Sequence, residues 1–154
     1  MLTQKALKAR LIYDPDSGVF TDRYGRERGT YKKGYLATKV GKKPYLLHRL
    51  AWLYMTGVWP MAIDHINCVK TDNRWENLRE ATQKENTRNT IPRPSKSGYK
   101  GVEFTGKSYR ARIRIANPGK RKYLELGRFA TAEEAFAAYT EANEKLYGSF
   151  GRAK

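Results

Sequence analysis

Apolar and polar positions in the first half of the chain change their period several times. A helical spacing over 3–11 gives way to strand-like alternation broken by glycine turns, and the predicted strands are 19–21, 35–40 and 44–47. The helical period returns over 48–56, where Gly57 is expected to end the helix. The first 47 residues are therefore predicted to form a helix and a small antiparallel sheet.

The second half predicts two further groups of strands and helices. Segments 62–66 and 77–80 are typical of a hairpin with a long polar loop, and the capping-box pattern at 82–85 begins a helix that runs to about Asn89. Residues 91–97 hold two prolines and two cations, as in an extended linker. A second capping box then starts a final helix, after three predicted strands at 99–104, 109–115 and 123–126.

The charge of the chain is large and unevenly distributed. The 154 residues hold 31 Lys and Arg against 15 Asp and Glu, a formal net charge of +16. Residues 1–47 contribute +7 and residues 91–154 contribute +8, whereas residues 48–90 contribute only +1. A surplus of this size indicates a polyanionic partner, nucleic acid before an anionic membrane surface. The distribution predicts two cationic flanks around a nearly neutral middle.

Cysteine and apolar content exclude several classes of protein. Cys68 is the single cysteine, which excludes an internal disulfide and any zinc site built on paired cysteines. Lys5, Lys8 and Arg10 interrupt the first segment, so no secretory signal is expected there. The longest apolar run, 50–55, is far shorter than a membrane span. We therefore expect an intracellular protein with no membrane partner.

Four polar residues of the middle segment could meet at one point. Asp64 and His65 end the first strand of the predicted hairpin, Asn77 begins the second, and Asn86 lies on the following helix. Phosphodiester hydrolysis needs a divalent cation held by oxygen ligands and a base that titrates near neutral pH. Asp64 and Asn86 could hold the cation, His65 could deprotonate water, and Asn77 could hold the loop or the imidazole. Turn formation is the alternative role of such residues, and His48 is interpreted as structural.

The middle segment also carries a series of spaced motifs: LHRLAW at 47–52, IDHIN at 63–67, DNR at 72–74, NLR at 77–79, and AT at 81–82 leading to Asn86 and Asn89. Together they resemble the HNH endonucleases, most closely those encoded by phages and introns. The resemblance implies a ββα-metal core, with His65 as general base, Asp64 as metal ligand and Asn77 as the brace of the loop. The third motif position, often His, is Asn86, which favours one hard ion, Mg²⁺ or Mn²⁺, and no zinc is expected.

The last third carries a row of arginines. Arg110, Arg112 and Arg114 alternate with apolar residues, which places all three on one face of a strand. Such a row suits a major groove, and a solvated outer face is the alternative. The segments SGYKGV at 97–102, LELGRF at 124–129 and 131–139 resemble the AP2 DNA-binding domain, which has three antiparallel strands on one helix. That resemblance implies that Arg112, Arg114 and Tyr123 face DNA. Further predicted DNA contacts are Lys32, Lys33, Lys42, Lys43, Arg93, Lys96, Lys100 and Arg121.

The sequence therefore predicts an α+β, metal-dependent DNA endonuclease of the homing type in the cytoplasm of a bacterial or phage-infected cell. The expected segments are a basic sheet (1–47), a nuclease core (48–90), a linker (91–97) and an AP2-like domain (98–154). Its partner would be double-stranded DNA, nicked or cut, with no small-molecule cofactor. A DNA-binding regulator with a vestigial nuclease core is the main alternative. An RNA-binding protein is the second, although no RNP-type aromatic motif supports it.

Overall fold

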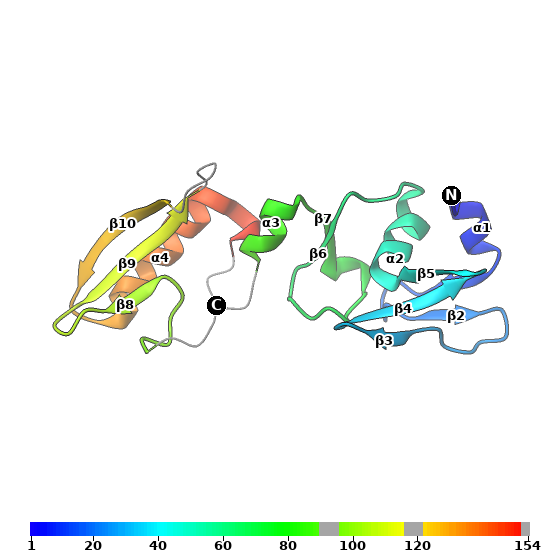
Figure 1. Ribbon diagram of the computed structural model, residues 1–154, viewed down its shortest axis with the longest axis horizontal. Coiled ribbons are helices and arrows are strands. Elements are labelled where there is room, and N and C mark those ends of the chain that lie inside the picture. Colours follow the sequence, from blue (N-terminus) through cyan, green and yellow to red (C-terminus); the bar gives the residue numbers. More distant parts are fainter. Residues whose placement is uncertain (90–95, 116–121, 152–154) are drawn as a thin grey trace. The chain divides into compact units, whose positions relative to one another are not determined.

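The computed structural model describes residues 1–89, 96–115 and 122–151 and confirms the predicted α+β class (Figure 1). The chain divides into two compact units, Met1–Thr87 and Arg88–Lys154. Two of the predicted DNA contacts, Arg93 and Arg121, lie outside the described residues, as does 91–95 of the predicted linker. Among the described helices, none is long and apolar enough to cross a membrane.

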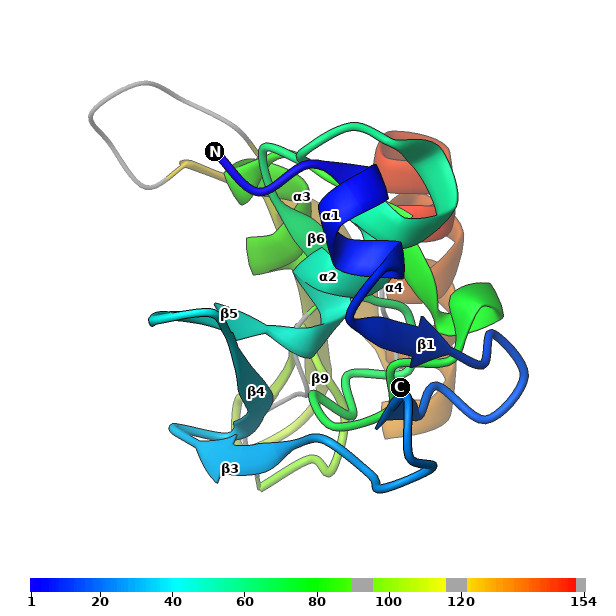
Figure 2. The same ribbon diagram turned by 90° about the vertical axis from the view of Figure 1, so that its right-hand side faces the viewer.

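The first unit consists of short elements. In chain order they are α1 (Gln4–Lys8), β1 (Leu11–Tyr13), β2 (Phe20–Asp22), β3 (Thr30–Lys32), β4 (Tyr35–Val40), β5 (Lys43–Leu46), α2 (Leu47–Thr56), β6 (Ile63–His65), the 3₁₀ helix η1 (Trp75–Asn77), β7 (Leu78–Glu80) and α3 (Gln83–Arg88). Strands β1 and β2 pair, β3, β4 and β5 form an antiparallel sheet, and β6 pairs with β7 (Figures 1 and 2). The helix predicted over 3–11 is wrong at its end, because Leu11 and Tyr13 alternate inward as a strand.

One hydrophobic core joins the two segments predicted over 1–47 and 48–90. Leu7 and Phe20 come from the first segment and are fully buried against Leu50 and Leu53 of α2. Each such side chain contributes roughly 1.5–3 kcal/mol through burial. Gly57 ends α2 as predicted, with the left-handed φ of 78° that a helix C-terminus favours. The basic sheet and the nuclease segment therefore fold as one body.

The second unit is a three-stranded antiparallel sheet packed on one helix, as predicted. Its elements are β8 (Val102–Phe104), β9 (Tyr109–Ile115), β10 (Lys122–Phe129), α4 (Ala132–Tyr147) and the 3₁₀ helix η2 (Gly148–Phe150), with the strand order β10-β9-β8. Thr131 and Glu134 form the predicted capping box at the start of α4. Ala111 and Ala135 are fully buried between sheet and helix. Strand β10 continues three residues beyond its predicted end because a bulge at 125–127 absorbs the register shift.

Candidate active site

The hairpin β6–β7 and the helix α3 bring three of the predicted site residues together. All three residues of β6 are buried, and Asp64 and His65 pair in register with Arg79 and Leu78 of β7. The side-chain amide of Asn86 donates to the main-chain oxygen of Ile63, 3.2 Å away, which ties α3 to the same strand. Residues 82–85 form the predicted capping box, with Glu85 accepting from both the main chain and the hydroxyl of Thr82.

Asp64 has an arginine partner that the sequence did not predict. Arg79 donates to Oδ2 of Asp64 from Nε at 2.8 Å and from Nη2 at 2.6 Å. The Asp64 side chain is 6% exposed and the Arg79 side chain 15% exposed, so this is a buried pair. The signal for it was the spacing, since a hairpin closed near Asn77 places Arg79 directly opposite Asp64. The guanidinium fixes the carboxylate in one orientation.

A divalent cation at this hairpin would take its protein oxygen ligands from Asp64 and Asn86. Within the described ranges, no group of three or more His, Cys, Asp or Glu side chains could hold a metal ion. Asp64 offers carboxylate oxygen, and the amide nitrogen of Asn86 is already used by Ile63, which leaves the Asn86 amide oxygen for a ligand. Two oxygen donors suit a hard ion that keeps several waters, as Mg²⁺ does.

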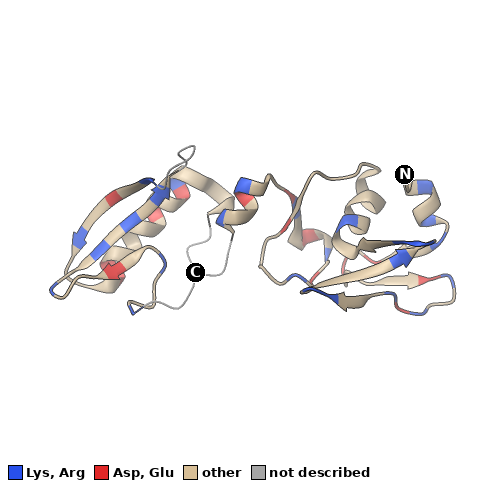
Figure 3. Ribbon diagram, viewed as in Figure 1, with Lys and Arg blue, Asp and Glu red and all other residues tan. Residues whose placement is uncertain are grey.

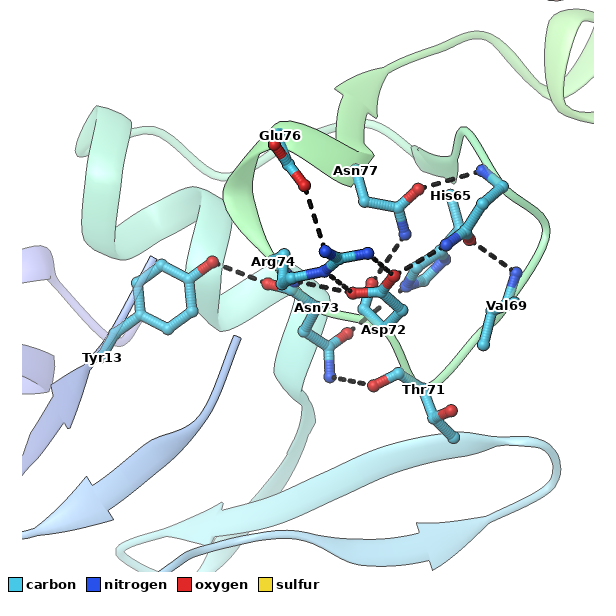
Figure 4. Close-up of polar contacts among 10 residues, drawn as sticks. Tyr13, His65, Val69, Thr71, Asp72, Asn73, Arg74, Glu76 and Asn77 are labelled. Carbon is cyan, nitrogen blue, oxygen red and sulfur yellow. Dashed lines mark hydrogen bonds and ion pairs between the residues drawn. The ribbon is translucent and has the colours of Figure 1, made fainter. Parts of the chain in front are cut away.

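The imidazole of His65 is held by an asparagine other than the predicted one. Its Nε2 lies 3.3 Å from Oδ1 of Asn73, whose amide nitrogen donates to the main-chain oxygen of Thr71 (Figure 4). Because Oδ1 can only accept, Nε2 of His65 carries the proton and Nδ1 is the basic nitrogen. Burial lowers the pKa of His65, while Asn73 and Asp64 act in the opposite direction. A neutral imidazole is thus the resting form at neutral pH.

Asn77 joins the two ends of the loop that follows β6. Its Oδ1 accepts from the main-chain nitrogen of Asn67 at 2.9 Å, and its Nδ2 donates to the main-chain oxygen of Asp72 at 2.8 Å (Figure 4). Asp72 in turn accepts from both Asn67 and Arg74. The hydrogen bonds from Arg74 are the main cause of the Asp72 pKa of about 2. Of the two roles considered for Asn77, the geometry is that of a loop brace.

The N-terminal hairpin β1–β2 also holds this loop. The hydroxyl of Tyr13 donates to the main-chain oxygen of Asn73 at 2.6 Å (Figure 4). Trp75 donates its main-chain N–H to the oxygen of Pro15 at 2.9 Å. A Cβ at Gly18 would lie 2.5 Å from backbone atoms of Asn73 and Arg74, so only glycine permits this approach. Burial raises the pKa of Tyr13. The residue that orients His65 is therefore itself held by residues 13–18.

A second imidazole lies against the first. His48 of α2 is 6% exposed, and its ring centroid is 4.9 Å from that of His65 in an edge-on arrangement. Tyr35 of β4 packs on both, with centroids 5.1 Å from His48 and 6.1 Å from His65. Among the described residues, Nδ1 of His48 has no hydrogen-bond partner. Burial lowers the pKa of His48 to about 3, so this ring is neutral.

The arginine row lies on β9 as predicted, and Figure 3 shows Lys and Arg positions recurring along this strand. Ala111 and Ile113 are buried on the opposite face. An acidic side chain of the neighbouring strand contacts this row. Glu103 of β8 accepts from Arg110 at 2.6 Å and lies 3.3 Å from Arg112, because strand pairing sets Glu103 opposite Arg110. The hydrogen bond from Arg110 lowers the pKa of Glu103. The guanidinium of Arg112 also lies 4.9 Å above the ring of Tyr123.

The other predicted DNA contacts are dispersed. Lys32 and Lys33 lie at the β3–β4 turn, whereas Lys42 and Lys43 lie at the β4–β5 turn, and all four are exposed. The six residues of β4 separate the two turns by roughly 20 Å. In the second unit Lys96 is exposed, the Nζ of Lys100 donates to the main-chain oxygen of Arg88, and the exposed Arg114 accepts at its main-chain oxygen from the hydroxyl of Tyr147. Within the first unit, the two pairs of lysines therefore do not form one patch.

Strands β6 and β7 followed by helix α3, with the Asp64–His65 pair on β6 and Asn86 on α3, have the order expected of the predicted nuclease core. Residues 45–88 match the family model described as HNH endonuclease, which supports nuclease activity. The match runs from β5 to the end of α3 and contains every side chain of the Asp64, His65 and Asn86 cluster. The resemblance seen in the motifs is thereby confirmed.

A second similarity concerns DNA binding. The chain is 48% identical over 58 residues to dehydration-responsive element-binding protein 2E of Oryza sativa subsp. japonica, a match that covers 37% of this chain and 18% of the rice protein. The chain thus spans less than a fifth of that relative. No solved structure matches the chain. Together the two similarities agree with an HNH segment joined to an AP2-like domain.

Proposed function

We propose that the protein is a metal-dependent, site-directed DNA endonuclease of the homing type that nicks or cuts double-stranded DNA. The observation that carries this proposal is the cluster at β6 and α3. There a fixed carboxylate (Asp64), an oriented neutral imidazole (His65) and an amide oxygen (Asn86) lie within one tied hairpin and helix. Such a set matches the needs of phosphodiester hydrolysis: oxygen ligands for a divalent ion and a general base.

In the proposed mechanism, Nδ1 of His65 takes a proton from the attacking water. The water oxygen then bonds to phosphorus as the bond from phosphorus to the leaving ester oxygen breaks. Asn73 keeps the resting proton on Nε2, so Nδ1 is the basic nitrogen when the water arrives, and the ring becomes an imidazolium after the transfer. Asp64 and Asn86 would hold a divalent cation, Mg²⁺ or Mn²⁺, which supplies positive charge for the phosphate and the leaving oxygen. Arg79 keeps Asp64 in place for that ligand.

DNA would be held by charges outside the cluster. The exposed sheet face of the second unit offers Arg110, Arg112 and Arg114, with Tyr123 stacked under Arg112. These groups suit base edges and phosphates of a major groove. The lysines at the two ends of β4 would contact phosphates. One cluster acting once nicks a single strand, so cutting both strands would need a second binding event or a second copy of the chain.

The experiment is cleavage of the DNA that flanks the gene, with the cut ends mapped at nucleotide resolution. We expect discrete ends in Mg²⁺ or Mn²⁺ and none in EDTA. Duplex binding without cleavage under any divalent ion would instead support the DNA-binding regulator. Competition by duplex DNA and by RNA across a salt series separates the RNA-binding alternative, because RNA would then be the stronger competitor at every ionic strength.

A further inference from the structure

Lys70 lies beside the candidate active site without belonging to its hydrogen-bond network. It follows His65 by five residues, in the loop that Asn77 closes. The chain reverses sharply there, since Cys68 donates its main-chain N–H to the oxygen of His65 at 2.8 Å and adopts a left-handed φ of 63°. This turn carries Lys70 back toward β4.

The side chain of Lys70 rests on the β3–β4 turn. Its Nζ lies 5.0 Å above the ring centroid of Tyr35, a cation–π geometry. Its Cδ lies 3.6 Å from where a Cβ would stand on Gly34, so the aliphatic stem covers that glycine. Tyr35 is the residue whose ring also faces His65 and His48. An ammonium group is thus held on the aromatic wall of the site, where its charge acts on His65.

Lys70 differs from the arginines of the same hairpin. Arg74 is committed to Asp72 and Glu76, and Arg79 is committed to Asp64. Lys70 makes no ion pair with a carboxylate among the described residues and is exposed. A buried or paired cation stabilises the fold, whereas an exposed cation that packs on an aromatic ring can bind an anion from solution.

We propose that Lys70 is a catalytic residue that binds a nonbridging oxygen of the scissile phosphate, and that Tyr35 is the positioning residue that holds it there. The inference rests on the proposed nuclease function. Negative charge on these oxygens grows as water adds to phosphorus, so a fixed ammonium group stabilises the transition state more than the ground state. Lysine suits this role as a compact point charge with three donors. The basic N-terminal sheet would then contribute to the reaction as well as to binding.

The test measures single-turnover nicking of a supercoiled plasmid that carries the DNA flanking the gene, at saturating full-length protein and in Mg²⁺. We expect Lys70→Met to lower the rate by about 10- to 100-fold, in the range of a lost transition-state donor. Binding of the same plasmid in EDTA should weaken by less than about threefold, the loss of one phosphate contact. Lys70→Arg keeps the charge and should recover part of the rate. Lys5→Met removes one exposed charge on α1 and is the matched control, with an unchanged rate.

Tyr35 is tested through its coupling to Lys70. Tyr35→Phe keeps the ring and should stay within about threefold of the wild type, whereas Tyr35→Leu should lose roughly tenfold. The double variant of Lys70→Met and Tyr35→Leu should be no slower than Lys70→Met alone, because the ring acts through the ammonium group. Additive losses in that double variant would reject the positioning role. Thermal unfolding of each variant identifies losses due to misfolding.

The outcomes separate this inference from the nuclease proposal. If Lys70→Met nicks the plasmid at the rate of the wild-type protein, the catalytic role of Lys70 is rejected and the nuclease proposal is unaffected. Weaker plasmid binding with an unchanged rate at saturation would also overturn it and make Lys70 an ordinary phosphate contact. A wild-type protein that nicks nothing in Mg²⁺ or Mn²⁺ would reject the proposed function, and the role of Lys70 with it.

Discussion

Each unit of the protein contains a carboxylate hydrogen-bonded to an arginine, but the two pairs have opposite surroundings. In the first unit the side chains of Asp64 and Arg79 are 6% and 15% exposed, and their contact spans two paired strands. In the second unit the side chains of Glu103 and Arg110 are 49% and 27% exposed, on a sheet face open to solvent. The donor–acceptor distance is 2.6 Å in both pairs.

The two pairs differ in how easily the arginine can leave its carboxylate for another partner. Removing a buried charge from its partner leaves an uncompensated charge, so Asp64 stays where Arg79 holds it. An exposed pair is screened by water and salt and contributes little, so Arg110 can leave Glu103 for a phosphate at small cost. The first unit is therefore organised around a fixed geometry, and the second around exchangeable contacts.

The largest effect is expected from a substitution in the first unit, where the geometry is fixed. His65→Ala removes the proposed general base and should lower Mg²⁺-dependent nicking by about 10²- to 10⁴-fold, while duplex affinity in EDTA stays near that of the wild type. Gel-based nicking and binding assays on one preparation check both. Cleavage at the wild-type rate by this variant would remove His65 from the mechanism.

The two arginines should differ strongly in their effect on the free energy of unfolding. Arg79→Met leaves the Asp64 carboxylate buried without its partner and should destabilise the first unit by about 3–5 kcal/mol. Arg110→Met breaks an exposed pair and should change stability by less than about 1 kcal/mol. Urea unfolding measures the loss of stability in both variants. Tryptophan fluorescence follows the first unit, and hydrogen exchange follows the second. Equal losses would contradict the contrast drawn between the pairs.

Mild acid should affect the first unit alone, because both histidines lie in it. The pKa of His48 falls from 6.5 to about 3 on folding, so the unfolded chain binds the additional proton as the pH drops below 6.5. Stability is then complete above pH 6.5 and is lost progressively toward pH 3, by a total on the order of 5 kcal/mol.

Fluorescence of Trp52, Trp59 and Trp75, which all lie in the first unit, follows this loss directly. His48→Phe removes the titrating group and keeps an aromatic ring, so its stability should vary less between pH 6.5 and 4.5. An identical slope in the variant would show that His48 does not control the acid response.

The smallest effect is expected from a substitution in the second unit, where the contacts are exchangeable. Glu103→Gln releases Arg110 and Arg112 and should tighten duplex binding by about three- to tenfold at low salt, with the gain fading as salt rises. Glu141→Gln is the matched control, because Glu141 forms a more exposed ion pair with Lys145 on α4, away from the arginine row. Binding isotherms across a salt series compare the two. Equal effects of both substitutions would mean that the arginine row does not contact DNA.

Local patterns predicted most of the fold. The period of two defined β9 to the residue, and both capping boxes marked true helix starts, because these signals depend on neighbours within four positions. The first helix was predicted too long because Leu11 fits an apolar helix face and an inward strand position equally well. What neighbouring residues could not reveal was the common core of 1–47 and 48–90, which depends on contacts between distant segments.

The sequence predicted the residues of the candidate site better than it predicted the residues that hydrogen-bond to them. The cluster of Asp64, His65 and Asn86 follows from motif spacing, and the loop-bracing geometry of Asn77 was one of its two expected roles. The partners Arg79, Asn73 and Glu103 depend on strand register and loop conformation, which composition does not specify. The catalytic and DNA-binding roles of all these residues remain predictions.

The contacts from Tyr13 and Pro15 to the loop at Asn73 and Trp75 bear on how the proposed nuclease site could be transferred to another protein. The segment that matches the HNH family begins at residue 45, well after these two supports. A chimaera cut at that boundary would carry the motifs but lose the clamp on the asparagine that orients His65. A functional graft should instead start before α1, so the smallest portable nuclease is about twice the length of the recognisable motif.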